Sequence, residues 1–257
     1  MHFAANISTL FTALPPLARI AAAAQAGFRG VEMQFPYEHE PAALAAAARE
    51  ASVRFALINM PAGDFGNGER GTACIPGREL EFQAGIMRAT DYAMALECRR
   101  VNCLAGNLPA GANITSCRAL LVNNLRLAAD ALAPHGITLL LEPLNRVENP
   151  SFILHGTEDA LSIIHEADRP NLALQLDTYH SAMAGEDGSD MLARHVGQIG
   201  HIQISDCPGR GAPGTGTLDF ARFFGTLSEL AYRGWIGCEY TGSEPDFAWM
   251  RRYALTP

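Results

Sequence analysis

The sequence predicts an α/β fold made of a single (β/α)8 TIM barrel that spans residues 1–257. The chain has 257 residues, close to the roughly 250 residues of one complete barrel of this type. Short apolar segments alternate with alanine- and leucine-rich amphipathic segments, which predicts parallel strands connected by helices. Eight apolar segments favour closure into a barrel over an open sheet, and no linker rich in proline, glycine or serine divides the chain.

The predicted strands and helices follow one another in regular order. Gly27, Gly136 and Gly234 each follow a predicted helix, as is typical of helix C-terminal caps. The predicted strands are Phe3–Asn6, Gly30–Met33, Arg54–Asn59, Arg100–Leu104, Ile137–Glu142, Leu172–Asp177, His201–Ile204 and Trp235–Glu239. The predicted helices are Pro15–Ala26, Pro41–Ala51, Glu79–Leu96, Ser116–Ala133, Thr157–Ala167, Asp190–Val196 and Asp219–Leu230.

Two of the predicted connections are unusually long, so the barrel has extended loops after strands 3 and 7. They are Met60–Arg78 and Ser205–Leu218. Because both follow strands, they lie on the face of the barrel where active sites are built. Long glycine-rich loops in a compact domain are usually functional, and we expect these two to cover or contact a substrate.

The charged residues exclude several classes of function. The formal net charge is −8, which argues against a nucleic-acid-binding protein, since such a protein needs a basic surface. All 19 basic residues are arginine, and the chain contains no lysine. Because a guanidinium does not lose its proton to become a nucleophilic amine, Schiff-base chemistry, pyridoxal phosphate attachment and lysine-dependent phosphate loops are excluded.

The cysteine pattern and the N-terminal residues predict a cytoplasmic protein. Six cysteines are scattered without a C-x-x-C motif, which is typical of reduced thiols in the cytosol. Residues 1–10 lack a basic segment followed by an apolar core, so we expect no secretory signal. No uncharged apolar run of about 18 residues occurs, and we expect neither a membrane span nor a membrane partner.

Oxygen-bearing side chains stand at or near the ends of the last four predicted strands. A single acidic residue there is usually a helix N-cap or a solvated turn residue, but burying several unpaired carboxylates costs on the order of several kcal/mol each. A divalent cation removes that cost, and an all-oxygen ligand set favours Mg²⁺ or Mn²⁺ over Zn²⁺. We therefore expect one bound metal ion. The four residues, each one βα unit from the next, are Glu142, Asp177, Gln203 and Glu239.

Two histidines lie close to these positions in the sequence. His180 follows Asp177 by three residues, and His201 precedes Gln203 by two. The side chains of His201 and Gln203 therefore point to the same side of their strand. A buried, hydrogen-bonded histidine is the ordinary interpretation of both. We prefer it for His201, as a layer beneath the metal, and expect His180 at the barrel mouth to contact substrate.

Longer motifs carry a family resemblance that covers nearly the whole chain. The most specific is GERG-x-AC-x-PGRE at residues 68–79, and the others are FAANISTLF, GFRGVEMQFPY, LLLEPLN, QLDTYH, IGHIQISD, PGTG and WIGCEY. In these motifs the sequence resembles the hydroxypyruvate isomerase family, within the xylose-isomerase-like barrel superfamily that also contains ketose 3-epimerases. The resemblance implies a metal-dependent isomerase.

The resemblance also implies which residues hold the metal. In that family a glutamate, an aspartate, a glutamine (a histidine in the epimerases) and a second glutamate on strands five to eight are the ligands. The two glutamates are also the acid/base pair, here Glu142 and Glu239. The implied ligands in this chain are therefore Glu142, Asp177, Gln203 and Glu239.

Four further residues are implied to bind substrate. The resemblance gives this role to His180 and Arg210, and it matches Glu148 to a carboxylate position in the epimerases that braces the site. Because an arginine fork matches a carboxylate, Arg210 is the first choice for the substrate carboxylate and Arg70 the second. Residues 209–212 read G-R-G-A where the family more commonly has H-R-G-E, which alters the rim of the site but none of its metal ligands.

The expected reaction is the interconversion of hydroxypyruvate and tartronate semialdehyde (2-hydroxy-3-oxopropanoate) by proton transfer through an enediolate. The expected partner of the protein is thus a small sugar-acid substrate. A 2-oxotetronate isomerase or a ketose 3-epimerase would use the same metal centre. An apurinic-site endonuclease-like phosphodiesterase would need a histidine-rich multi-zinc cluster and a basic surface. A protein that binds sugar acids without turnover would not need both glutamates. A homo-oligomer is left open.

Overall fold

The computed structural model describes residues 1–241 and 247–255 of the chain. Its eight strands form one closed parallel barrel in sequence order, with β8 pairing back onto β1, and so confirm the predicted barrel. The predicted domain also includes residues 242–246 and 256–257, which lie outside the described residues. The strands are β1 His2–Asn6, β2 Gly30–Met33, β3 Arg54–Asn59, β4 Arg100–Cys103, β5 Thr138–Leu141, β6 Leu172–Asp177, β7 Ile199–Ile204 and β8 Trp235–Cys238.

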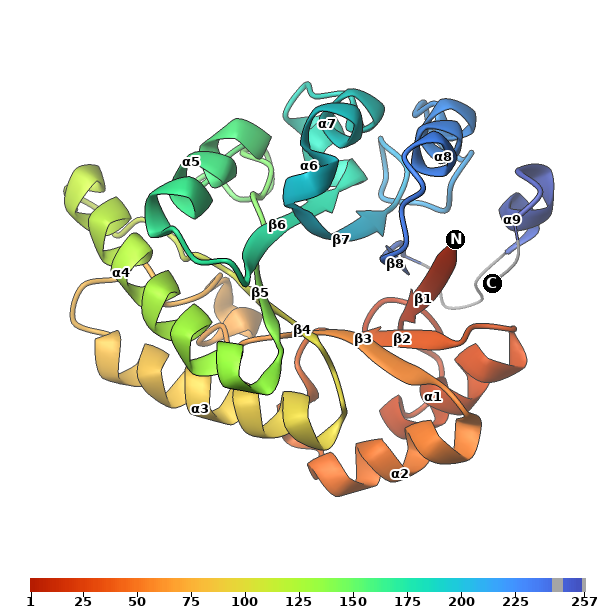
Figure 1. Ribbon diagram of the computed structural model, residues 1–257, viewed down its shortest axis with the longest axis horizontal. Coiled ribbons are helices and arrows are strands. Elements are labelled where there is room, and N and C mark those ends of the chain that lie inside the picture. Colours follow the sequence, from red (N-terminus) through yellow and green to blue (C-terminus); the bar gives the residue numbers. More distant parts are fainter. Residues whose placement is uncertain (242–246, 256–257) are drawn as a thin grey trace.

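The main helices lie on the outside of the strands, as Figure 1 shows for α1 to α5. Short 3-10 turns precede or follow some of them. The helices are α1 Pro16–Gln25, α2 Pro41–Ala51, α3 Glu79–Ala95, α4 Ile114–Leu132, α5 Thr157–Ala167, α6 Thr178–Met183, α7 Gly188–His195, α8 Phe220–Glu229 and α9 Ala248–Arg252. The 3-10 turns are η1 Pro36–Glu38, η2 Phe65–Asn67, η3 Ala133–His135 and η4 Val196–Gln198.

Several features of the local structure differ from the prediction, which did not include the short helix α9. Helix α6 was not predicted, because six residues are too few to show helical periodicity; it begins where the Asp177 carboxylate accepts a hydrogen bond from the Tyr179 backbone N–H at 2.7 Å. The predicted C-terminal cap at Gly234 is wrong. Helix α8 ends at Glu229, and Ala231 adopts the left-handed conformation with φ 49°. A Cβ on Gly234 would lie 2.2 Å from the Tyr232 hydroxyl, so close packing requires this glycine.

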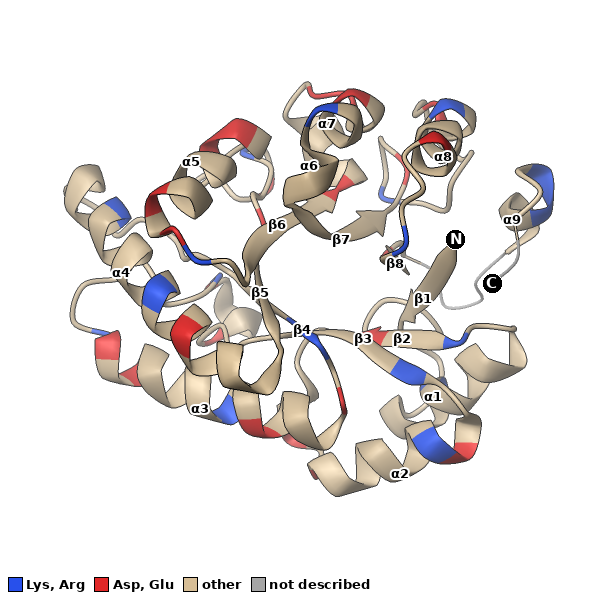
Figure 2. Cartoon of the chain, viewed as in Figure 1, with Lys and Arg blue, Asp and Glu red and all other residues tan. Residues whose placement is uncertain are grey.

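The apolar core lies between the strands and the outer helices, whereas the inside of the barrel is polar. Figure 2 shows charged residues of both signs on the outer helices and little charge along most strands. None of the described helices combines the length and apolar character needed to cross a membrane. The buried polar residues on the strands, or directly after β5 and β8, are Asn6, Glu32, Asn59, Asn102, Glu142, Gln175, Asp177, His201, Gln203 and Glu239.

Both long loops make close contacts, the first with a neighbouring segment and the second within itself. In the loop after β3, Gly71 has φ 103°, and a Cβ there would lie 1.8 Å from the Leu104 carbonyl oxygen, so the loop packs directly on the chain after β4. In the loop after β7, the buried Asp206 carboxylate accepts hydrogen bonds from the backbone N–H groups of Gly214 at 2.8 Å and Leu218 at 3.1 Å. Both loops lie at the C-terminal ends of the strands, where Phe65, Arg70 and Arg210 line a cavity.

Candidate metal centre and active site

A cavity of about 170 Å³ opens at the C-terminal ends of the strands. It is smaller than the roughly 300–1,000 Å³ of pockets for drug-sized ligands, which suits a small metabolite. Seven of the eight predicted site residues line it, and the eighth, Asp177, contacts the cavity residue Arg210. The lining residues are Gln34, Asn59, Phe65, Arg70, Leu104, Glu142, Leu144, Glu148, Asn149, Gln175, His180, Gln203, Arg210 and Glu239.

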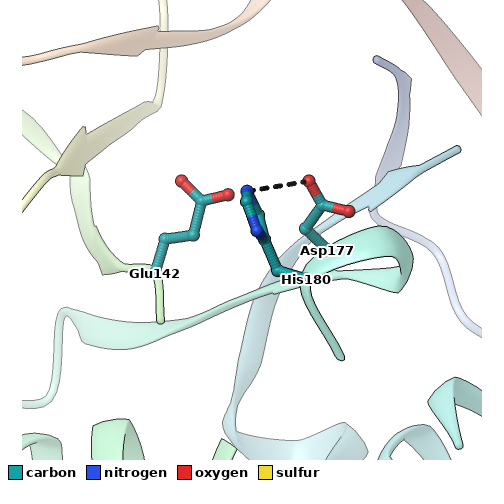
Figure 3. Close-up of side chains that lie close together, drawn as sticks. All are labelled: Glu142, Asp177 and His180. Atoms are coloured by element: carbon teal, nitrogen blue, oxygen red, sulfur yellow. Dashed lines mark ion pairs between the residues drawn. The ribbon is translucent and has the colours of Figure 1, made fainter. Parts of the chain in front are cut away.

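The side chains of Glu142, Asp177 and His180 converge from three successive segments of the chain (Figure 3). Glu142 directly follows β5, Asp177 ends β6, and His180 lies in α6. One potential ligand atom from each lies within 4.8 Å of the others, and all three residues are buried. The Glu142 carboxylate also accepts a hydrogen bond from Asn102 Nδ2 at 2.8 Å. This arrangement places two carboxylates and an imidazole around one small volume.

The hydrogen bonds of His180 fix which of its nitrogens carries the proton. The backbone N–H of Asn145 donates to His180 Nδ1 at 3.1 Å, and a backbone N–H can only donate. Nδ1 is therefore the acceptor, and in the neutral ring Nε2 carries the hydrogen. Burial lowers the pKa of His180, which favours that neutral ring. Nε2 lies 3.9 Å from Asp177 Oδ2, too far for a hydrogen bond, and its N–H can serve a ligand oxygen.

Burial makes the two predicted catalytic glutamates unusually basic. It raises the pKa of Glu142 well above its ordinary value, with further contributions from the nearby charges of Glu239 and Asp177. Burial likewise raises the pKa of Glu239 to about 8, although Arg210 opposes the shift. In the metal-free protein the Glu239 carboxyl can therefore both accept and release a proton near neutral pH.

Arg210 lies between two of the predicted metal ligands. Its Nη2 donates to Glu239 Oε1 at 2.9 Å and to Asp177 Oδ2 at 3.3 Å. Burial alone would lower the pKa of Arg210, but the negative charges of Glu239 and Asp177 outweigh it and raise the pKa. The guanidinium thus partly neutralises these two carboxylates, whereas Glu142 makes no hydrogen bond or ion pair with it in the described part of the chain.

The donor set fits a divalent cation. Glu142 and Asp177 offer buried carboxylate oxygens within one small cluster, and a cation beside them would favour their charged form. Gln203 and Glu239 add an amide and a carboxylate on the wall of the same cavity. Oxygen donors of this kind suit Mg²⁺ or Mn²⁺. His180 fits less well as a ligand, because its Nε2 would have to give up the proton that the Asn145 contact assigns to it.

The remaining predicted residues hold different parts of the cavity wall. Arg70 is fixed by its Nε, which donates to Asn149 Oδ1 at 3.2 Å, and by its guanidinium, which lies 4.2 Å from the centre of the Phe65 ring. Glu148 accepts hydrogen bonds from the Tyr179 hydroxyl at 2.5 Å and from Asn145 Nδ2 at 3.0 Å. Burial would raise the pKa of Glu148, but these hydrogen bonds lower it overall.

Sequence reasoning missed several polar residues that support the site. Gln34, directly after β2, donates from Nε2 to Glu239 Oε1 at 2.8 Å. Gln175 donates from Nε2 to Gln203 Oε1 at 2.6 Å, and its own buried Oε1 has no partner among the described residues. Strand alternation could have identified Gln175, because it lies two residues before Asp177 and so faces the same side. Gln34 lies outside its strand, and only the fold brings it to the site.

We expect the metal-free protein to lose stability as the pH rises from about 5 to 8. The pKa of Glu239 rises from an ordinary 4.5 to about 8 in the folded protein, so the folded state holds this proton more tightly than the unfolded state. The resulting stabilisation is complete below the unfolded pKa and is lost as the pH passes through the folded one. Urea unfolding in chelator at several pH values measures this. Glu239→Gln should flatten the dependence, and stability that rises over this range would contradict the prediction.

Comparisons with known proteins find a matching family model and several similar proteins. Residues 20–253 match the model of a family described as xylose isomerase-like TIM barrel. The chain is 43% identical to hydroxypyruvate isomerase of Escherichia coli over 98% of this chain and 99% of that protein. It is 41% identical to 2-oxo-tetronate isomerase of Cupriavidus necator over 98% of each. A solved structure from Brucella melitensis, described as AP endonuclease, family 2, is 40% identical over 98% of each chain, with a TM-score of 0.94.

Proposed function

Since the chain belongs to the hydroxypyruvate isomerase family of xylose isomerase-like TIM barrels and is an isomerase of sugar acids, we propose that it interconverts hydroxypyruvate and tartronate semialdehyde. The observation that carries this proposal is the pair of buried glutamates, Glu142 and Glu239, which both line a cavity sized for a small metabolite. Moving a carbonyl between adjacent carbons requires one proton to leave a carbon and another to reach its neighbour, and a carboxylate pair can do both.

The two glutamates divide the proton transfers. From hydroxypyruvate, one carboxylate removes a C3 proton to form the enediolate, and the other delivers a proton to C2, while the proton of the C3 hydroxyl passes to the C2 oxygen. The reverse direction exchanges their roles. A bound Mg²⁺ or Mn²⁺, held by Glu142, Asp177, Gln203 and Glu239, would make the carbon-bound proton more acidic by withdrawing charge from the carbonyl. His180 would donate its Nε2–H to a substrate oxygen.

Arg70 is proposed here to hold the substrate carboxylate. Arg210 Nη2 already donates to Glu239 and Asp177, and although its buried Nε has no partner among the described residues, we assign Arg210 the role of balancing the charge of the acid/base centre. Arg70 lines the same cavity, and its Nη2 makes no hydrogen bond or ion pair within the described part of the chain. A rigid guanidinium with an available N–H suits a carboxylate.

A second candidate is a 2-oxotetronate isomerase. It is favoured by the 41% identity to the enzyme of that name from Cupriavidus necator, and it differs from the first by one further hydroxylated carbon on the substrate. The endonuclease named for the Brucella melitensis structure is disfavoured. His180 is the one histidine among the described residues that line the cavity, and a net charge of −8 opposes the approach of nucleic acid.

A substrate panel tests the proposal and the carboxylate contact together. Hydroxypyruvate, 2-oxotetronate and neutral ketoses are each assayed with Mg²⁺ or Mn²⁺, and we expect hydroxypyruvate to give the highest kcat/KM. Arg70→Ala should raise KM for the acids roughly tenfold to a hundredfold, because a hydrogen bond to a charged group contributes about 1.5–3 kcal/mol. Neutral ketoses serve as the control, since they lack the carboxylate. If a neutral ketose or 2-oxotetronate gave the highest kcat/KM, that compound would be assigned as the substrate in place of hydroxypyruvate.

A further inference from the structure

A buried carboxylate, Glu32, lies beneath the cavity and has no place in the reaction described above. It is on β2, is 1% exposed and does not line the cavity. Its Oε1 lies 2.5 Å from His201 Nε2, and its Oε2 accepts hydrogen bonds from Gln203 Nε2 at 2.9 Å and Asn6 Nδ2 at 3.3 Å. These partners come from β1 and β7, so the carboxylate connects strands on both sides of the point where the barrel closes.

The barrel makes room for this carboxylate through a glycine. A Cβ on Gly237, in the middle of β8, would lie 2.1 Å from Glu32 Oε1 and 2.4 Å from Oε2. No real Cβ approaches an oxygen so closely, so any larger residue would force the carboxylate to move. With β8 included, four adjacent strands shape the space around Glu32. A site enclosed in this way holds the carboxylate in one position.

The position of Glu32 dictates which way the Gln203 amide faces. An amide has a donor end and an acceptor end, and the two look alike in shape. Glu32 accepts hydrogen bonds, so the Gln203 nitrogen must face it, as the 2.9 Å contact requires. The oxygen is then turned to the other side, where Gln175 Nε2 donates to it at 2.6 Å. One lone pair of that oxygen remains available beside the cavity that Gln203 lines.

We infer that Glu32 is a positioning residue that keeps the Gln203 amide oxygen, and not its nitrogen, available to a bound divalent cation. An amide nitrogen has no lone pair to offer a hard cation, so a reversed amide would remove one ligand. Groups that orient metal ligands through hydrogen bonds typically change metal affinity 10–100-fold when they are replaced. The inference rests on the proposed metal site and adds the residue that orients one of its ligands.

Glu32→Gln is the direct test, with Mn²⁺ as the probe. In the variant, the nitrogens of His201, Gln203 and Asn6 compete for one amide oxygen, where the native protein offers them two carboxylate oxygens. The orientation of the Gln203 amide is then no longer fixed. We expect Mn²⁺ affinity, measured by titration calorimetry and by the paramagnetic signal of free Mn²⁺, to fall about tenfold to a hundredfold. At saturating Mn²⁺, kcat should return to within about threefold of the unmodified enzyme, because positioning the ligand and not the chemistry is affected.

Two further variants separate positioning from general damage. Gly237→Ala displaces the Glu32 carboxylate without changing its charge and should lower Mn²⁺ affinity in the same direction. His201→Gln leaves the Glu32–Gln203 contact in place and should change the affinity less than about threefold. In a Gln203→Leu background, Glu32→Gln should have little further effect, since there is no amide left to orient. Thermal unfolding of each metal-free variant checks that it is folded.

The inference is overturned if Glu32→Gln binds Mn²⁺ as tightly as the unmodified protein, or if it weakens binding equally in the Gln203→Leu background. It is also overturned if the unmodified protein binds no divalent cation at all. The protein could instead bind Mn²⁺ tightly, lose affinity in the Glu32→Gln and Gly237→Ala variants as expected, and isomerise no sugar acid. That result would refute the proposed function and leave the role of Glu32 intact.

Discussion

Replacing either Glu142 or Glu239 with glutamine should remove nearly all turnover while the barrel stays folded. General acid–base catalysis contributes about 10²–10⁴-fold, and each glutamate carries one of the two proton transfers, so kcat should fall by at least that factor in either variant. Burial raises the pKa of both groups in the metal-free protein, and a bound cation would favour the ionised form that takes up a carbon-bound proton. Glutamine keeps the size and polarity of the side chain but cannot take up a carbon-bound proton.

Solvent deuterium distinguishes this mechanism from direct hydride transfer. Turnover in deuterated water should incorporate deuterium at the carbon that receives the proton, because a carboxyl group exchanges its hydrogen with solvent. Glu81→Gln is a matched control for the two glutamate variants, since Glu81 on α3 forms a surface ion pair with Arg78 and lies outside the cavity. Active enzyme that gives product without solvent label would refute the two-glutamate mechanism, even if the substrate assignment were correct.

Removing the metal should abolish activity, and Mg²⁺ or Mn²⁺ should restore it. Without a cation, Glu142, Asp177 and Glu239 are buried, and among the described residues Arg210 is the one arginine that contacts any of them. The substrate carbonyl would then have no Lewis acid beside it. Asp177→Asn is the informative variant for this site. Asparagine caps helices as well as aspartate, so it can still accept from the Tyr179 N–H at the start of α6.

The Asp177→Asn variant should therefore bind Mn²⁺ about tenfold to a hundredfold more weakly while keeping its fold. Calorimetric titration with Mn²⁺ measures the affinity, and circular dichroism verifies the helix content. Exhaustively chelated enzyme that retains full activity would remove the metal from the mechanism altogether.

The sequence by itself determined the fold and grouped the four predicted metal ligands. Alternation of apolar strands and amphipathic helices is a local pattern, and eight repeats of it in a chain of this length have few other solutions. Parallel strands also bring their C-terminal ends to one face, so Glu142, Asp177, Gln203 and Glu239 could be grouped from spacing alone. Helix ends were less predictable: Ala231 takes the left-handed conformation expected at Gly234, because local packing decides where a helix stops.

Only the tertiary structure decided what each of these residues can do. The tautomer of His180 depends on the backbone N–H of Asn145, 35 residues away. Arg210, and not Arg70, is committed to Glu239 and Asp177, although both arginines come from loops over the same cavity. Glu32 and Gln203 are 171 residues apart and meet at 2.9 Å. Hydrogen-bond direction, burial and pKa are set by atoms that are close in space. Strand periodicity does not indicate which side chains far apart in the sequence become neighbours in the fold.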